Sequence, residues 1–183
     1  MLNERLIDAA IAVLEGAGGR LDITNLNKSL FYFDLVMLRD VGATFTKAEY
    51  VALPRGPVVQ DYRTDLVEAL VRGGFATQGN DGMAKPVVLK DERPHRFATD
   101  HVSVIDVARK MGAKAKTRTA TQLSEYSHEN LGWKRAITRG NGTPINMLLA
   151  MQQIAEVDPW LSEKKWTDAE FIVVADGSTA EPW

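Results

Sequence analysis

The chain has 183 residues, of which 45% are hydrophobic and 25% are charged, proportions that are typical of one soluble globular domain. Its formal net charge of -2 gives it no overall attraction to nucleic acid or to an anionic membrane. It has no cysteine, which excludes disulfides and thiolate chemistry, and no uncharged apolar stretch reaches the roughly 20 residues of a membrane span, so we expect a cytoplasmic protein with no membrane segment.

Two helices are predicted before residue 42. Apolar residues recur at helical spacing over residues 3–15, and glycines end the run. A second helix begins near Asp22 or Thr24, both good caps, and ends before Gly42. Its centre, residues 30–38, is apolar on almost every side, which is typical of the central helix of a bundle.

A short strand and an unusual turn come next. Residues 50–53 form an apolar run, which is followed by Pro-Arg-Gly-Pro. Pro57 suits the first position of a helix, so a third helix is predicted over residues 57–72. Gly56 lets the chain turn, but this structural interpretation leaves Arg55 unexplained.

A hairpin and a fourth helix are predicted in the middle of the chain. Residues 74–90 read as two strands around Asp81-Gly82, a favoured pair for a tight turn. Asp100 is expected to cap a helix that ends at Gly112.

Three short helices are predicted after residue 118. Thr119 opens the first with a capping-box pattern. Ser127 is expected to cap the second. The pair Thr143-Pro144 is expected to begin the third, which ends near Asp158.

The predicted fold class is therefore mainly α (α+β), a compact multi-helix bundle with a small β-hairpin. We expect one domain over residues 1–156 and a tail over 157–183, which adds a strand or acts as a partner-binding arm. The element order in the N-terminal half resembles a winged helix-turn-helix, with residues 57–72 as the recognition helix. That helix carries three acids against two arginines, which is poor for a groove lined by phosphates. The basic cluster over residues 109–118 is the alternative site for phosphate contacts.

Asp34 is the most informative single residue because it lies on an apolar helical face. A buried carboxylate without a partner costs several kcal/mol, so it needs donors. Candidate partners are Tyr50, Arg55, His128 and the amides of residues 54–57. We expect Asp34 to pin that loop, and a catalytic or ligand-binding carboxylate is the alternative.

Nucleophilic and metal chemistry find little support in the sequence. Ser127 and His128 are adjacent, so on a helix they point in different directions and would not form a hydrogen bond with each other. The three histidines lack metal-ligand spacing. We therefore expect no catalytic set, metal site or cofactor.

Two groups of residues together resemble the Panacea antitoxin domain, the SocA-like family once labelled phage-associated proteins. The first group is Leu26, Lys28, Leu30, Tyr32, Asp34, Gly42, Tyr50, Ala52, Gly56, Pro57 and Val58. The second group is Leu123, Ser124, Ser127, His128, Trp133, Gly142 and Ile145. The resemblance covers about residues 3–150, and one departure is Phe33, which stands before Asp34 where the family commonly has a small residue.

The resemblance implies a cytoplasmic bacterial or phage antitoxin that neutralises a cognate toxin by direct binding and has no enzymatic activity. It also allows a role as an adaptor that delivers the toxin to an AAA+ protease. A winged-helix transcriptional regulator that binds DNA is the alternative function, and an enzyme is a third. The family does not specify which toxin is bound.

Two sets of site residues follow. The expected partner-binding residues are Arg55, Tyr62, Trp160 and Trp166. The family-motif residues expected to be mainly structural are Asp34, Tyr50, Gly56, Pro57, His128 and Trp133. A contact between His128 and Asp34, or between Trp133 and the turn, would explain why two distant segments characterise one domain.

Overall fold

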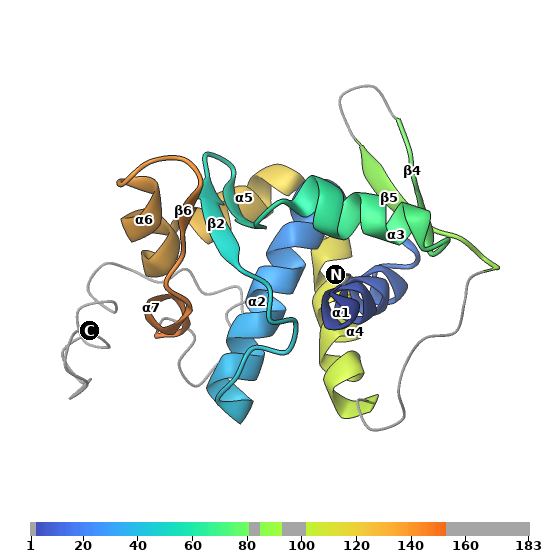
Figure 1. Ribbon diagram of the computed structural model, residues 1–183, viewed down its shortest axis with the longest axis horizontal. Coiled ribbons are helices and arrows are strands. Elements are labelled where there is room, and N and C mark those ends of the chain that lie inside the picture. Colours follow the sequence, from blue (N-terminus) through green and yellow to red (C-terminus); the bar gives the residue numbers. More distant parts are fainter. Residues whose placement is uncertain (1–2, 81–84, 93–101, 153–183) are drawn as a thin grey trace.

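The computed structural model describes residues 3–80, 85–92 and 102–152 (Figure 1). These residues are mostly helical, with two small three-stranded antiparallel sheets, which confirms the predicted mainly helical α+β class. The tail, the tip of the hairpin and the expected cap at Asp100 lie outside the described residues. Within the described ranges, no helix has both the length and the apolar character needed to cross a membrane.

Helix α2 (Ile23–Val41) is the central element, as its apolar sequence predicts. Every residue from Asn25 to Met37 is buried, and Figure 1 shows the helix running through the middle of the molecule. The helix ends at Gly42, whose φ of 77° closes the last turn in the left-handed conformation that glycine tolerates. Other helices and one sheet therefore pack around α2.

Helices α1 (Glu4–Gly16) and α4 (Val102–Lys116) cross at two glycines. A Cβ atom on Gly16 would lie 1.9 Å from the carbonyl oxygen of Arg109, and one on Gly112 would lie 1.8 Å from that of Val13. The predicted end of the helix at Gly112 is wrong because this glycine lies inside α4. It permits backbone contact with α1, and the helix continues to Lys116.

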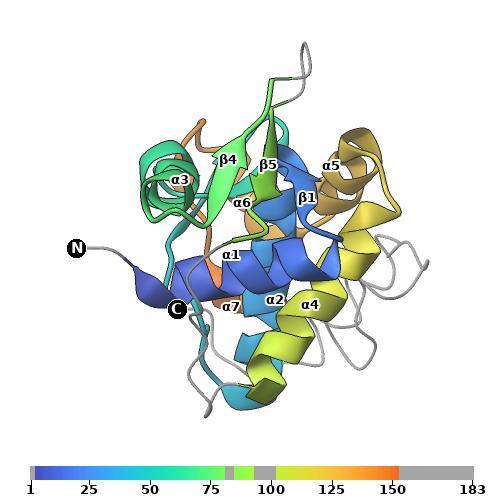
Figure 2. The same ribbon diagram turned by 90° about the vertical axis from the view of Figure 1, so that its right-hand side faces the viewer.

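The first sheet contains β1 (Arg20–Asp22), β5 (Pro86–Leu89) and β4 (Ala76–Gln78), in that order. Strands β4 and β5 pair antiparallel, as the hairpin pattern predicts. Strand β1 is absent from the predicted elements because three residues are too few to show a period. Figure 2 shows this sheet on one side of α1, with α4 on the other.

The second sheet has the order β3 (Gly56–Val59), β2 (Tyr50–Leu53), β6 (Thr143–Pro144). Strand β2 is confirmed, but the predicted helix start at Pro57 is wrong because this residue pairs with Ala52 in the sheet. Thr143 and Pro144 do not begin a helix either, since they pair with β2.

The helical part of the expected third helix is shorter than predicted. It consists of a π-helix, η1 (Tyr62–Glu68), followed by α3 (Ala69–Arg72). The winged-helix element order is therefore interrupted by β3, which takes the place of the first helical turn.

Three further helices follow α4. The capping box at Thr119 is confirmed at the start of α5 (Ala120–His128), where Thr119 and Gln122 exchange hydrogen bonds. Helix α6 (Leu131–Ile137) is capped by Asn130, so the predicted cap at Ser127 is wrong. Helix α7 (Met147–Met151) is capped by the side chain of Asn146.

Candidate functional site

The turn between β2 and β3 is a surface segment whose backbone is held by side chains from three helices, and we call it the braced turn. Leu53 pairs with Gly56 in the ladder, so Pro54 and Arg55 form a two-residue turn, and both are exposed. Figure 1 shows the turn at the upper end of β2, close to α5 and β6.

Three consecutive carbonyl groups of the turn accept hydrogen bonds from three different helices. The indole Nε1 of Trp133 on α6 donates to the Leu53 carbonyl oxygen at 3.0 Å. The imidazole of His128, at the end of α5, donates to the Pro54 carbonyl. The Nζ of Lys28 on α2 donates to the Arg55 carbonyl. Side chains on the protein side of the turn therefore fix its backbone, and the side chains of Pro54 and Arg55 remain exposed on the solvent side.

Gly56 is required at the base of the turn for two independent reasons. Its φ of 109° lies in the region that other residues rarely adopt. A Cβ atom there would also lie 2.3 Å from the Oγ of Ser127 and 2.9 Å from the Nζ of Lys28. The backbone of β3 thus approaches α2 and α5 more closely than any side chain would allow.

His128 and Trp133 form a stacked pair beneath the turn. Their ring centroids are 4.3 Å apart, and the ring planes differ by 13°. Burial lowers the pKa of His128 and Lys28 lowers it further, against a smaller opposite effect of the Pro54 hydrogen bond. The Nε2 atom is enclosed without a hydrogen-bond partner among the described residues, which suits a neutral imidazole. The expected contact between Trp133 and the turn is present.

Lys28 is an unusual buried amine, with 0% of its surface exposed. Burial lowers its pKa from 10.5 to about 7, and the nearby Arg55 guanidinium contributes to the shift. The next residue back, Asn27, accepts a hydrogen bond from the Val59 amide at 2.9 Å. Helix α2 therefore holds β3 with two adjacent side chains, one at each end of the strand.

Asp34 belongs to a separate buried cluster. Its carboxylate accepts hydrogen bonds from the Phe45 amide at 2.9 Å, from both the amide and the hydroxyl of Thr46, and from the Tyr50 hydroxyl at 2.8 Å. Burial raises the pKa of Asp34 despite these four donors. The expected partner Tyr50 is present, whereas Arg55, His128 and the amides of residues 54–57 are not partners. Asp34 fixes the segment that leads into β2 instead.

The side chains that suggested nucleophilic catalysis are engaged elsewhere. The Oγ of Ser127 donates to the Ser124 carbonyl at 2.9 Å, while Asp34 is occupied by the cluster just described. A Ser–His–Asp relay is therefore not assembled. In the described part of the chain, no group of three or more His, Asp or Glu side chains is arranged to hold a metal ion.

The other predicted partner-binding residues are placed only in part. Tyr62 is half-buried at the start of η1, and the Arg63 guanidinium lies over its ring at 5.8 Å from the centroid. Asp61 just before it has a φ of 51°, a strained value for a residue other than glycine. Trp160 and Trp166 lie outside the described residues.

Sequence reasoning missed Lys28 as a site residue, although the family motif includes it.

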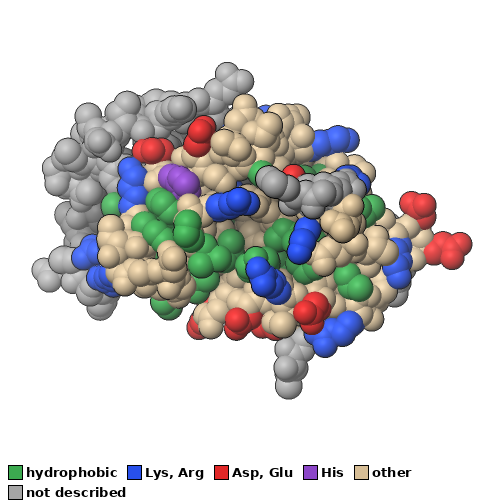
Figure 3. Space-filling view, turned by 90° about the horizontal axis from the view of Figure 1, so that it is seen from above, with side chains coloured by type: hydrophobic (Ala, Val, Ile, Leu, Met, Phe, Trp, Pro, Cys, Tyr) green, Lys and Arg blue, Asp and Glu red, His purple; other side chains and the backbone are tan. Residues whose placement is uncertain are grey.

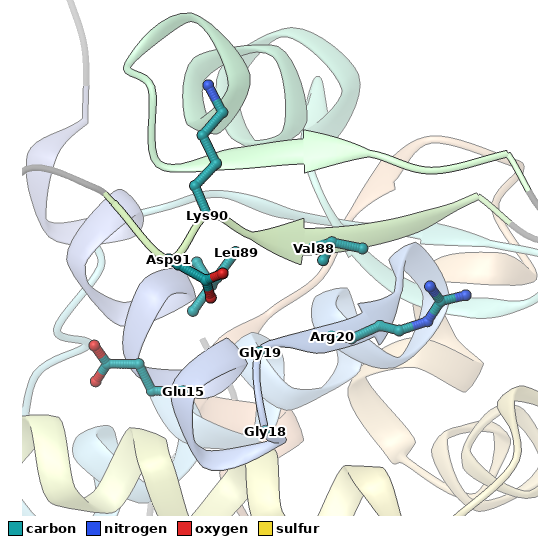
Figure 4. A pocket seen from close by; sticks show the side chains of 8 residues that line it. All are labelled: Glu15, Gly18, Gly19, Arg20, Val88, Leu89, Lys90 and Asp91. Carbon is teal, nitrogen blue, oxygen red and sulfur yellow. The ribbon is translucent and has the colours of Figure 1, made fainter.

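A shallow hollow of about 390 Å³ lies elsewhere, between the end of α1 and the strands β1 and β5. Its charged side chains include Glu15, Arg20 and Lys90. Figure 4 shows these side chains fanning outward rather than converging on a common point. The hollow therefore lacks the convergent polar groups of a ligand site.

Comparison with known proteins gives one match. A family model described as antitoxin SocA-like, Panacea domain, matches residues 26–134, which is more than half of the chain. The matched segment contains the turn and all three side chains that donate to its carbonyl groups. Neither the curated proteins nor the solved structures give a significant match.

Proposed function

The chain belongs to the SocA-like Panacea antitoxin family, and on this basis we propose that it neutralises a cognate toxin in the cytoplasm by direct protein–protein binding. The observation that carries this proposal is the braced turn at Pro54 and Arg55. A binding surface gains affinity when its groups are already held in the bound conformation, because less freedom is lost on association. The turn offers an exposed arginine on a fixed backbone.

The surface around the turn has the composition of a protein interface. Arg55 is exposed, Val58 and Tyr62 are half-buried, and Arg63 covers the Tyr62 ring. Tyrosine and arginine are enriched among the residues that dominate binding energies. Figure 3, which views the molecule from above relative to Figure 1, shows hydrophobic side chains gathered on this face with Lys and Arg side chains among them. We assign toxin contact to this turn face, defined as Pro54, Arg55, Val58, Tyr62 and Arg63.

A growth assay tests the proposal. The chain is co-expressed with the product of the neighbouring gene, and rescue from toxicity is expected. Arg55→Glu should abolish rescue, whereas Lys110→Glu should not, because Lys110 is an exposed residue of α4, which packs on α1 and α2. Both variants must retain the circular dichroism spectrum and melting temperature of the wild type. Toxicity that the folded wild type never relieves would contradict the proposal.

The tail is proposed as a second contact through Trp160 and Trp166. A chain ending at residue 156 separates this contribution from that of the turn face. We expect the truncated chain to stay folded, because it keeps the whole of the core cluster formed by the described residues, which runs from Leu6 to Met151. It should bind the toxin more weakly than the full chain. Unchanged affinity would remove the tail from the interface.

An adaptor role in proteolysis is proposed on family membership alone. It predicts that the toxin is degraded faster in the presence of this chain, and only in cells that have the relevant AAA+ protease. Pulse-chase measurement of toxin half-life in protease-deficient and wild-type cells decides the point. Equal half-lives would leave simple sequestration as the mechanism.

A winged-helix DNA-binding function is supported less well. The helical segment after β3 exposes Asp61, Asp65 and Glu68 alongside Arg63 and Arg72. This acidic surface would face the phosphates of a DNA groove. We therefore expect no salt-dependent retention on duplex DNA at low ionic strength. Retention that falls steeply with salt would favour the regulator.

A further inference from the structure

Two basic groups meet at the turn without a counter-ion. The Arg55 guanidinium is exposed and makes no hydrogen bond or ion pair with any residue that the structure describes. The Nζ of Lys28 lies beneath it and donates to the carbonyl of the same Arg55. No carboxylate in the described ranges forms a salt bridge with Lys28 either. Within the described ranges neither cation is therefore paired with a carboxylate, although Glu125 and Glu129 act on the neighbouring His128.

Two other exposed or half-buried cations differ from Arg55 because each is paired with a carboxylate. Lys134 on α6 pairs with Glu129 at 3.1 Å, and Arg109 on α4 pairs with Glu15 and Asp106, each at 2.9 Å. These two cations are thus paired with acids, whereas Arg63 contacts the Tyr62 side chain and Arg72 donates to backbone carbonyls. Arg55 has no such partner among the described residues, and the buried Lys28 amine lies directly behind it.

We infer that the Pro54–Arg55 turn binds a carboxylate of the partner protein, so that the docking segment of the toxin presents an Asp or Glu whose oxygens accept hydrogen bonds from the Arg55 guanidinium. This inference rests on the proposed function and adds the chemistry of one contact to it. The planar guanidinium matches a carboxylate with two parallel hydrogen bonds. Because the turn is already fixed, little freedom is lost when this pair forms.

A single carboxylate suits the site better than a polyphosphate. Asp61, Asp65 and Glu68 are exposed on the segment that follows β3, and Glu125 is exposed on α5. These acids repel an extended chain of phosphates, whose charge is repeated at short intervals. A single carboxylate carries only one charge, so these acids repel it less than they repel a polyphosphate.

Lys28 couples this contact to pH. The charged or titratable groups that act on it from neighbouring elements are Arg55 on the turn and His128 on α5, whose imidazole is mainly neutral. A carboxylate paired with Arg55 offsets the repulsion from the guanidinium and therefore raises the pKa of Lys28. Binding then takes up protons, so the affinity falls as the pH rises above about 7, where free Lys28 loses its proton.

The test uses the full chain and an inactive form of the toxin identified by co-expression. Isothermal titration gives the Kd for wild type, Arg55→Lys, Arg55→Gln and the matched control Lys110→Gln, at pH 6.5 and pH 8.5. We expect Arg55→Gln to weaken binding roughly 30-fold or more, Arg55→Lys to weaken it less, and the control to stay within about twofold. The wild type should lose affinity roughly threefold to tenfold between the two pH values, and Arg55→Gln should lose this dependence.

A charge exchange identifies the partner group. When the acid on the toxin is replaced by arginine, binding to the wild type should fall, and Arg55→Glu should restore it. Wild-type binding with no effect of Arg55→Gln would overturn the carboxylate site but leave the antitoxin function in place. Failure of the wild type to bind the toxin would count against the proposed function itself. Loss of DNA binding in Arg55→Gln, with toxin binding unchanged, would assign the arginine to a phosphate.

Discussion

Asp34 and Lys28 lie on the same helix, and both are buried, but their surroundings differ. Asp34 accepts four hydrogen bonds from Phe45, Thr46 and Tyr50. Lys28 donates to one carbonyl and forms no salt bridge with a described acid. The carboxylate is thus satisfied inside the molecule, whereas the amine supports a turn on its surface. We therefore assign Asp34 to stability, and in the proposed function Lys28 supports the turn that contacts the toxin.

Replacing Asp34 by alanine should destabilise the fold strongly. The change leaves two amides and two hydroxyl groups buried without an acceptor, so we expect a loss of about 3 kcal/mol or more in the free energy of unfolding. Urea unfolding and thermal melts measure this loss, with an expected fall of about 10 °C in Tm. Asp40→Ala on the same helix is the matched control. Asp40 is exposed and, among the described residues, pairs with its neighbour Arg39, so the change should alter stability by less than about 0.5 kcal/mol.

Lys28 should make stability depend on pH in the alkaline range. Between pH 7 and about 10 the unfolded chain carries a proton on this amine that the folded chain has lost, so the free energy of unfolding rises with pH in that window. Urea unfolding of wild type and Lys28→Met at pH 6, 7, 8 and 9 isolates the effect. The difference between them should be flat below pH 7 and shift by about 2 kcal/mol in favour of the wild type up to pH 9. A pH-independent difference would contradict an amine with a lowered pKa.

The need for a partner at Asp34 is predictable from the sequence, but the partner's identity is only partly so. An acid on an apolar helical face must be satisfied, and Tyr50 was among the candidates. Thr46 was not, because its role depends on how the loop before β2 folds back onto α2. Arg55 was expected to bind the partner, but its proximity to Lys28 escapes the sequence, since these two distant residues become neighbours only through the β2–β3 turn.

At the scale of elements, long helices were easier to predict than short strands. The periodic runs in α1 and α2 are long enough to identify a helix, and the capping box identifies the start of α5. Strands β1, β3 and β6 have two to four residues each, too few to establish a period. Pro57 and Pro144 were interpreted as helix starts because proline suits that position, but an edge strand tolerates it as well.

The close crossing of α1 and α4 predicts that Gly112→Ala destabilises the fold, although alanine is the better helix former. Alanine normally favours a helix over glycine by about 1 kcal/mol, so Gly112→Ala would stabilise an isolated α4. In the folded chain, the new Cβ would lie 1.8 Å from the Val13 carbonyl oxygen, so the two helices must separate. We expect a net loss of about 2 kcal/mol or more, measured by urea unfolding. Ala113→Ser, at an exposed position on the same helix, serves as the control, and a stabilised Gly112→Ala variant would refute the close crossing.

At the scale of the whole molecule, the turn depends on residues that are about a hundred positions apart. Lys28 comes from α2, while His128 and Trp133 come from the C-terminal part of the fold. The family resemblance identified these residues as a set, but only the fold brings them to three successive carbonyl groups. The same geometry separates internal support from the exposed side chains of Pro54 and Arg55, on which the proposed toxin contact depends.

The most direct test of this account is hydrogen–deuterium exchange of the full chain, alone and in complex with its toxin. Toxin binding at the turn face should slow exchange across residues 53–63, and α4, including its basic cluster, should be unaffected. Additional protection of the tail would be compatible with the proposed second contact. Protection confined to α4 or to the tail, with residues 53–63 unchanged, would contradict the central claim that the braced turn is where the partner binds.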